Sequence, residues 1–219
     1  SRKFTSQVFT HEGERSVQRN FGAQKARGKY LFFLDADMEI APTTTTECIR
    51  VIANSSMAAV IIPETTKGNS FYAKIKALEM KLYAGELDIE SPRFFLKTAF
   101  LSLGGYNKSL VAGEDWDLAQ RVRTLGRIVR VQTPLFHLNN SLVRELRHKI
   151  YYASKIRNYS KIQPQLFKQQ SGKARLILFW RKRNLLVKTP LTTIGLMGLK
   201  SIEFLLFLLV KLTWNKNHE

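Results

Sequence analysis

The sequence Tyr30-Leu31-Phe32-Phe33-Leu34-Asp35-Ala36-Asp37 runs from five apolar or aromatic residues into two carboxylates. A short apolar run of this kind predicts a buried strand over residues 30–35, with Gly28 at its boundary. Because side chains alternate along a strand, we expect Asp35 and Asp37 to point the same way. Ligands bind beyond the carboxyl ends of strands in an open α/β sheet, and two carboxylates there suit a hard divalent cation that also holds a diphosphate. A solvated acidic loop is the alternative.

The composition is that of one large globular domain, or of a domain with an appendage. The chain has 219 residues and is 44% hydrophobic, which is ample for a core. Its single cysteine, Cys48, excludes an intramolecular disulfide framework and a multi-cysteine zinc site, and is expected to pack as a small apolar side chain on the helix after Pro42. The chain starts at Ser1 without a signal-type apolar run, so we expect a processed protein or a segment of a longer one.

The net charge of +18 is concentrated in the last third of the chain. Residues 1–140 hold 19 Lys and Arg against 14 Asp and Glu, whereas residues 141–219 hold 16 against three. We therefore divide the chain into a globular core over 1–140 and a basic tail over 141–219. A basic segment attracts anionic surfaces, chiefly nucleic acid or acidic lipid headgroups.

Hydrophobic periodicity and turn signals predict strands that alternate with helices. Such alternation favours an α/β layer fold with a largely parallel sheet. The expected helices cover residues 16–27, 42–53, 71–86 and 115–125, and the expected strands cover residues 30–35, 58–62, 93–96 and 128–131.

The tail is expected to be helical and to meet a membrane. Residues 142–159 form a basic helix, and residues 191–214 are the most apolar stretch. A spanning helix needs about 20 apolar residues, but Lys200 and Glu203 interrupt this one, and each central charge costs about 2.5–3.5 kcal/mol on insertion. Pairing of these two side chains at i,i+3 softens that cost. We expect a helix at the membrane surface or a re-entrant one, with a spanning helix and a purely protein-packed helix as alternatives.

Polar and glycine residues gather around the expected 30–35 strand and recur later in the chain. They are Arg15, Arg19-Asn20, Gly22, Ala26 and Gly28 before the strand, Asp35-Ala36-Asp37 at its end, then Gly104-Gly105-Tyr106, Gly113-Glu114-Asp115-Trp116-Asp117-Leu118, Arg121 and His137. This order resembles the family 2 glycosyltransferases of the GT-A fold. The matching motifs are R-N-x-G-x-x-x-A-x-G, D-x-D, G-G-Y and E-D-x-D-L-x-x-R, over roughly residues 15–137. Each motif is unspecific alone, whereas their combination is specific.

The resemblance implies a doubly wound, GT-A-like, mostly parallel sheet and an inverting, metal-dependent hexosyltransferase that uses a nucleotide-diphosphate sugar. Asp35 and Asp37 would match the D-x-D that holds Mg²⁺ or Mn²⁺ and the donor. Asp37 would be the direct ligand, and Asp35 would reach the ribose or a metal-bound water. His137 would complete the metal site, with a structural histidine as the alternative. The donor would also contact Arg15, Arg19 and Asn20; pairing with loop carbonyls is the alternative for the last two.

The resemblance also implies the catalytic residues. Asp115 would match the base of inverting members and take the proton from the acceptor hydroxyl. The adjacent Glu114 would help to bind the acceptor or shape the loop. A helix N-cap is the structural alternative for Asp115. Asp117 is expected to be a first-turn acid favoured by the helix dipole, and Arg121 is expected to pair near this loop.

The front of the chain departs from the family pattern. GT-A enzymes normally begin with a strand, a helix and a second strand upstream of the R-N-x-G stretch, and only 14 residues precede Arg15 here. We therefore expect this chain alone to lack most of the nucleotide pocket and to bind sugar nucleotide weakly or not at all. A non-catalytic, membrane-associated GT-A-like scaffold is the alternative function.

The expected partners are a nucleotide-sugar, a lipid-linked or envelope glycan acceptor, and the cytoplasmic face of the cell membrane through residues 174–214. Nucleic acid is not expected, because the basic residues alternate with aliphatic runs rather than with stacking aromatics. A phosphatase of the haloacid dehalogenase type also uses an aspartate pair after an apolar strand. It would want Thr or Val where this chain has Glu39, and it gives no reason for Glu114-Asp115.

Overall fold

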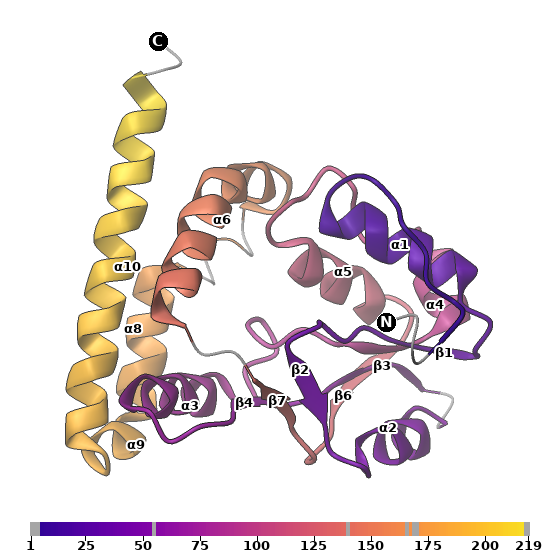
Figure 1. Cartoon of the computed structure of the whole chain (residues 1–219), viewed down its shortest axis with the longest axis horizontal. Helices are drawn as coiled ribbons and strands as arrows, with labels where there is room; N and C mark the ends of the chain where they lie inside the picture. The colour runs from indigo at the N-terminus through magenta and orange to yellow at the C-terminus, as the bar shows by residue number, and fades with distance from the viewer. Residues whose placement is uncertain (1–4, 54–55, 139–140, 165–166, 168–170, 217–219) are drawn as a thin grey trace.

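The computed structural model describes residues 5–53, 56–138, 141–164, 167 and 171–216. Helices and strands alternate first, and in the described residues only helices follow Ser141 (Figure 1). The described helices are α1 (Arg15–Lys25), α2 (Thr44–Ile52), α3 (Phe71–Tyr83), α4 (Lys97–Ser102), α5 (Glu114–Arg123), α6 (Leu142–Ile162), α8 (Gly172–Arg181), α9 (Arg183–Val187) and α10 (Pro190–Lys216). The described strands are β1 (Tyr30–Phe32), β2 (Met38–Ile40), β3 (Met57–Ile61), β4 (Glu64–Thr66), β5 (Phe94–Leu96), β6 (Arg127–Arg130) and β7 (Leu135–His137).

The described strands form two small mixed sheets. The larger sheet has the order β1-β5-β3-β6, in which β5 is antiparallel to both β1 and β3, and β3 is parallel to β6. The smaller sheet has the order β2-β7-β4, in which β7 is antiparallel to β2 and parallel to β4. The α/β class is confirmed, but the expectation of a mostly parallel sheet is wrong.

The antiparallel strand β5 has a local cause. The chain leaves the end of β3 through Pro63 and passes through β4 and α3. It then returns at the same end, where the Arg93 N–H donates to the Val60 carbonyl oxygen at 3.1 Å. A parallel strand would require a crossover back to the start of β3. Because the chain returns without one, β5 runs in the opposite direction.

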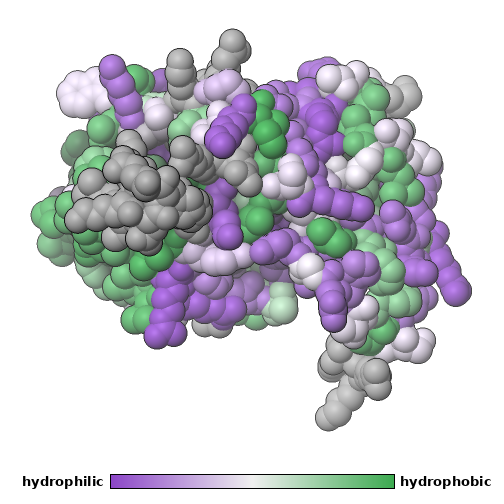
Figure 2. Space-filling model, turned by 90° about the horizontal axis from the view of Figure 1, so that it is seen from above, coloured by the Kyte–Doolittle hydropathy of each residue, from purple (hydrophilic) through white to green (hydrophobic). Residues whose placement is uncertain are grey.

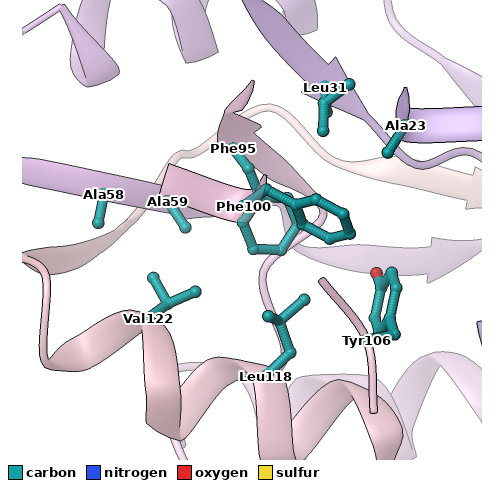
Figure 3. Packing of buried hydrophobic residues seen from close by; sticks show 9 residues of the cluster. All are labelled: Ala23, Leu31, Ala58, Ala59, Phe95, Phe100, Tyr106, Leu118 and Val122. Atoms are coloured by element: carbon teal, nitrogen blue, oxygen red, sulfur yellow. The ribbon is translucent and has the colours of Figure 1, made fainter. Parts of the chain in front are cut away.

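Helices cover both faces of the larger sheet. On one face the ring of Phe95 packs against Phe100 of α4, with ring centroids 5.6 Å apart, and α5 closes the cluster (Figure 3). On the other face Phe94 packs with Cys48 of α2. Neighbouring residues of β5 thus face opposite layers, as strand alternation requires. Cys48 is fully buried, which confirms its expected role as a small apolar side chain.

The strand that leads to the two carboxylates is shorter than expected. β1 ends at Phe32, and the Phe33 N–H donates to the Arg93 carbonyl oxygen at 2.9 Å. The Met38 N–H then donates to the Asp35 carbonyl oxygen at 3.1 Å, which closes a turn before β2. Asp35 and Asp37 therefore lie in a turn, and the expectation of a common direction based on strand alternation loses its basis.

The tail helices pack on α3 of the expected core. Leu82 of α3 is fully buried in a cluster with Phe179 of α8 and Leu196 of α10. α10 runs along one side of the molecule, and its C-terminal end projects beyond the neighbouring helices (Figure 1). Residues 139–140, at the expected boundary between core and tail, lie outside the described residues.

Candidate active site

A cavity of about 210 Å³ lies among α1, α3, α5 and the loop that precedes β5. Its charged lining residues are Arg15, Arg19, Glu64, Glu90, Arg93 and Asp115. Its other lining residues are Ile62, Met80, Tyr83, Ile89, Ser91, Pro92 and Tyr106. The cavity therefore combines guanidinium groups, carboxylates and an apolar wall.

Two arginines of the cavity hold Asp35. Arg19 forms an ion pair with Asp35 Oδ1, and Arg93 Nη1 lies 3.2 Å from Asp35 Oδ2. Burial raises the pKa of Asp35, but the charges of Arg93 and Arg19 outweigh burial and hold this pKa below its usual range. The turn that carries Asp35 is thereby joined to both α1 and β5.

The side-chain contacts of Arg93 extend this network to the smaller sheet. Arg93 Nε lies 2.5 Å from Glu64 Oε1, and Glu64 Oε2 lies 2.9 Å from His137 Nε2. Burial raises the pKa of Glu64, but Arg93 and His137 together lower it to about 2. His137 on β7 is thus linked through Glu64 and Arg93 to Asp35.

Sequence reasoning missed Arg93 and Glu64. Each directly follows a proline, Pro92 or Pro63, at the boundary of a buried strand. A charged residue in that position is the local signal that could have identified both residues.

The loop before α5 presents Asp115 to the cavity. Gly113 is the N-cap and has a φ of 80°, so the backbone turns sharply there. Asp115 follows in the first turn of the helix, and its Oδ1 accepts the Trp116 N–H at 2.9 Å. Asp115 is therefore not the N-cap, and it is one of the residues that line the cavity.

Glu114 supports this loop from inside. Its side chain is 1% exposed and forms an ion pair with Arg15, and its Oε1 lies 3.9 Å from Arg19 Nη1. Burial raises the pKa of Glu114, and the neighbouring charge of Asp115 raises it further. These contacts fix the start of α5 against α1.

Helix α6 packs over the same loop. A Cβ atom added to Gly113 would lie 2.6 Å from Cγ of Tyr159, so α6 contacts the turn directly. Tyr151 Oη donates to Glu14 Oε1 at 2.9 Å, and the guanidinium carbon of Arg15 lies 5.4 Å from the centroid of the Tyr152 ring. The first helix of the tail therefore packs behind Arg15 and Gly113, next to the residues that line the cavity.

Asn20 makes a structural contact. Its Nδ2 donates to the Tyr106 carbonyl oxygen at 2.8 Å, and the Tyr106 N–H donates to Asn20 Oδ1 at 2.8 Å. Asn20 thus makes the loop contact that was the alternative to donor binding. Arg121 pairs with Asp117 at 2.6 Å, as expected near this loop, and its Nη1 donates to the Leu103 carbonyl oxygen at 2.9 Å.

Residues 7–106 match the model of a protein family described as Glycosyl transferase family 2. Over these residues the chain resembles a family 2 glycosyltransferase domain. No curated protein matches the chain. The matched residues include Arg19, Asp35 and Arg93, whereas Glu114 and Asp115 lie beyond them.

A divalent cation is commonly used by such glycosyltransferases, but the three expected ligands do not converge. In the described residues no group of three or more His, Cys, Asp or Glu side chains is placed to hold a metal ion. The Asp35 carboxylate is already paired with Arg19 and Arg93, and the His137 ring is paired with Glu64. Within the described part of the chain, the Asp37 carboxylate has no hydrogen-bond or ion-pair partner. Because Mg²⁺ often takes one or two carboxylates together with substrate phosphates and waters, Asp37 alone fits that mode of binding.

Proposed function

We propose that this glycosyltransferase moves a hexosyl group from a nucleotide-diphosphate donor to an acceptor hydroxyl, with inversion at the anomeric carbon. The cavity in which Asp115 meets Arg15, Arg19 and Arg93 carries this proposal, and the three arginines belong to the residues that match the family. The arrangement supplies cations for a diphosphate and a carboxylate for a proton, which are the two charges that the reaction must handle.

The arginines stabilise the leaving diphosphate. A guanidinium group presents several N–H donors in a plane that matches phosphate oxygens. Arg15, Arg19 and Arg93 are each held by a carboxylate, namely Glu114, Asp35 and Glu64. Held side chains lose little freedom when a phosphate binds, so they are oriented in advance.

Asp115 acts as the general base. It takes the proton of the acceptor hydroxyl while the acceptor oxygen bonds to the anomeric carbon and the bond from that carbon to the diphosphate breaks. Its position in the cavity lining supports this role. Glu114 keeps the loop in place through Arg15.

Asp37 is the side chain that would hold a Mg²⁺ or Mn²⁺ ion together with the donor phosphates. When bound, such an ion neutralises charge that develops on the leaving diphosphate. Asp35 would orient Arg19 and Arg93 and so act one step away from the ion.

We propose a membrane-borne acceptor, such as a lipid-linked or envelope glycan, at the cytoplasmic face of the membrane. Tyr83 supports this part, because it lines the cavity and also contacts α8. Arg175 Nη1 of α8 lies 3.3 Å from Tyr83 Oη, and the rings of Tyr83 and Phe179 are 6.1 Å apart. The cavity wall and the basic apolar tail are thus continuous.

A donor screen tests the proposal. Membranes that contain the protein expressed from its complete gene are incubated with labelled uridine-, guanosine- and thymidine-diphosphate sugars, with Mn²⁺, Mg²⁺ or EDTA. We expect label in the lipid or glycan fraction from at least one donor, with a lower rate in EDTA and a higher Mn²⁺ requirement for Asp37→Asn. Absence of transfer from every donor would contradict the proposed reaction, and transfer that is unchanged by EDTA and by Asp37→Asn would contradict the role of Asp37.

A further inference from the structure

Lys200 and Glu203 of α10 point inward, whereas many of its apolar side chains point outward. A helix at a water-exposed surface normally places its charged residues outside and its apolar residues against the core. In α10 the side chains of Lys200 and Glu203 are only 19% and 12% exposed. Leu191, Ile194 and Leu205 are instead 74%, 70% and 58% exposed. Leu196 and Leu199 pack inward as in any surface helix, but the exposed side of α10 is apolar where water would favour charged residues.

The inward charges tie α10 to two other helices. Lys200 forms an ion pair with Glu79 of α3, and its Nζ lies 2.8 Å from Glu203 Oε2. Glu203 Oε2 lies 3.7 Å from Lys149 Nζ of α6. A Cβ atom added to Gly195 would lie 2.6 Å from Cδ1 of Ile75, so α10 also approaches α3 closely. α10 is therefore a fixed part of the glycosyltransferase rather than a loose tail.

We call the exposed apolar side chains of α8, α9 and α10 the docking face, and the exposed basic residues of 172–188 its basic border. Figure 2 shows hydrophobic surface along the side of the molecule where α10 lies. The apolar residues of the docking face are Leu176, Ile177, Trp180, Val187, Leu191, Ile194, Ile202 and Leu205, all exposed. Its exposed basic residues are Lys173, Arg181, Arg183 and Lys188. Residues 172–210 contain one acidic residue, Glu203, and it faces inward.

We propose that the docking face inserts into the surface of an acidic bilayer, with α10 lying along the membrane interface and not across it. The inference rests on the membrane association in the proposed function and gives that partner a defined face. Exposed apolar side chains enter the acyl boundary while the basic border meets anionic headgroups. A second copy of the chain is a poor occupant, because two basic borders would repel each other.

The neighbouring helices prevent α10 from crossing the bilayer. Residues 190–210 are long and apolar enough to span one, and their most apolar 18-residue window has a mean hydropathy of 1.9. However, the inner side of α10 is held against α3 and α6, and α6 exposes Arg144, Arg147 and Lys155. A crossing helix would carry these charges into hydrocarbon or break its ion pairs. Lying in the interface keeps them in water.

Vesicle sedimentation without any donor sugar tests the docking face. We expect the full chain to bind vesicles of mixed phosphatidylcholine and phosphatidylglycerol more tightly than vesicles of phosphatidylcholine alone. Leu205→Glu should lower the partition coefficient at least tenfold, because it places a charge on the apolar surface. Leu125→Glu is the matched control, because Leu125 is a comparably exposed leucine (51%) outside the docking face. Circular dichroism confirms that both variants fold.

Two results would overturn the proposal at this stage. One is equal binding of Leu205→Glu and Leu125→Glu. The other is a wild-type dimer in solution that Leu205→Glu dissociates, because a second copy would then cover the face. Either result leaves the transfer reaction unaffected, because the assay contains no donor and measures no activity.

The depth of fluorescent labels on α10 distinguishes a helix that lies in the membrane interface from a helix that crosses the bilayer. Ile194→Cys and Leu205→Cys, each in a Cys48→Ala background, carry a fluorophore that is quenched by lipids labelled at shallow or deep acyl positions. The two sites are separated by about 16 Å along the helix axis. A helix in the interface gives both labels the same shallow depth. A depth difference close to their separation along the axis would show a crossing helix and overturn the inference.

Discussion

At the scale of single residues, two adjacent glycines share a backbone conformation but have different neighbours. Gly104 and Gly105 have φ values of 74° and 72°, which cost other residues roughly 1–3 kcal/mol. A Cβ atom on Gly105 would lie 2.3 Å from Asn20 Oδ1, whereas one on Gly104 meets open space. We expect Gly105→Ala to lower the free energy of unfolding by about 1–3 kcal/mol more than Gly104→Ala, because it also disrupts the Asn20–Tyr106 hydrogen bonds.

Urea unfolding of both variants measures this difference. Introducing each alanine into an Asn20→Ala background should reduce the difference, since the Asn20 clash is gone, and the part that remains reports the clash with Phe100, whose Cε1 would lie 2.9 Å from the added Cβ. Equal losses of Gly104→Ala and Gly105→Ala in the wild-type background would refute the structural role of Asn20.

Glu64 gives a pH prediction. Its pKa is about 2 in the folded protein, below the ordinary 4.5, so its charge stabilises the fold above the ordinary value. That contribution is lost as the pH falls from near 4.5 towards 2. The shift corresponds to at most about 3 kcal/mol, and the exposed third of the side chain reduces this figure.

Urea unfolding over this pH range tests the Glu64 assignment. Glu64→Gln should show a smaller loss of stability on acidification than the wild type, whereas the exposed control Glu12→Gln should follow the wild type. Identical pH profiles for Glu64→Gln and the wild type would mean that the Arg93–Glu64–His137 contacts add no stability.

Residues near one another in sequence were predictable, and residues brought together by strands were not. Asp35 and Asp37 stand in one short motif and Asp115 in another, and both motifs are visible in the sequence. Arg93 and Glu64 acquire their role only because β4, β5 and the turn after β1 meet in space. That meeting has no periodic signal in the sequence.

At the scale of elements, the long helices were predictable because their apolar faces repeat over several turns. α1, α2, α3 and α5 all occur close to their expected ranges. β2, β4 and β7 were missed because three residues are too few to show alternation, and these strands lack the continuous apolar residues that mark the equally short β1 and β5. These strands are stabilised by pairing with one another, which is a tertiary effect.

The ion pair between Lys200 of α10 and Glu79 of α3 predicts how a substitution at Lys200 changes stability. Lys200→Met leaves the buried Glu79 and Glu203 with less compensating charge, and loss of one partner of a buried pair costs about 3–5 kcal/mol. We expect a smaller loss here, about 2 kcal/mol, because Lys76 still neutralises Glu79. Thermal unfolding measures the loss, with the exposed Lys188→Met as the control.

A double-mutant cycle separates the ion pair from other effects of Lys200→Met. Glu79→Gln combined with Lys200→Met should cost less than the sum of the two single changes. Additive costs would show that Lys200 and Glu79 are not coupled.

At the scale of the whole molecule, the α/β class and the helical tail were predictable from the pattern of elements and charge. The direction of β5 was not, because it depends on which end of the sheet the chain returns to. The inward orientation of Lys200 and Glu203 could not be predicted from the sequence either. Sequence spacing correctly predicts their mutual pairing, which occurs at 2.8 Å, but not the partners on α3 and α6. These contacts join the tail to the wall of the cavity.

In the proposed reaction, Asp115 removes the acceptor proton during sugar transfer. The most direct test compares the transfer rates of the wild type, Asp115→Asn and the exposed control Asp88→Asn, each expressed from the complete gene and assayed with the active donor. We predict that Asp115→Asn lowers the rate by about 10²–10⁴-fold without weakening donor binding, while Asp88→Asn stays at the wild-type rate. A wild-type rate for Asp115→Asn would show that Asp115 is not the general base.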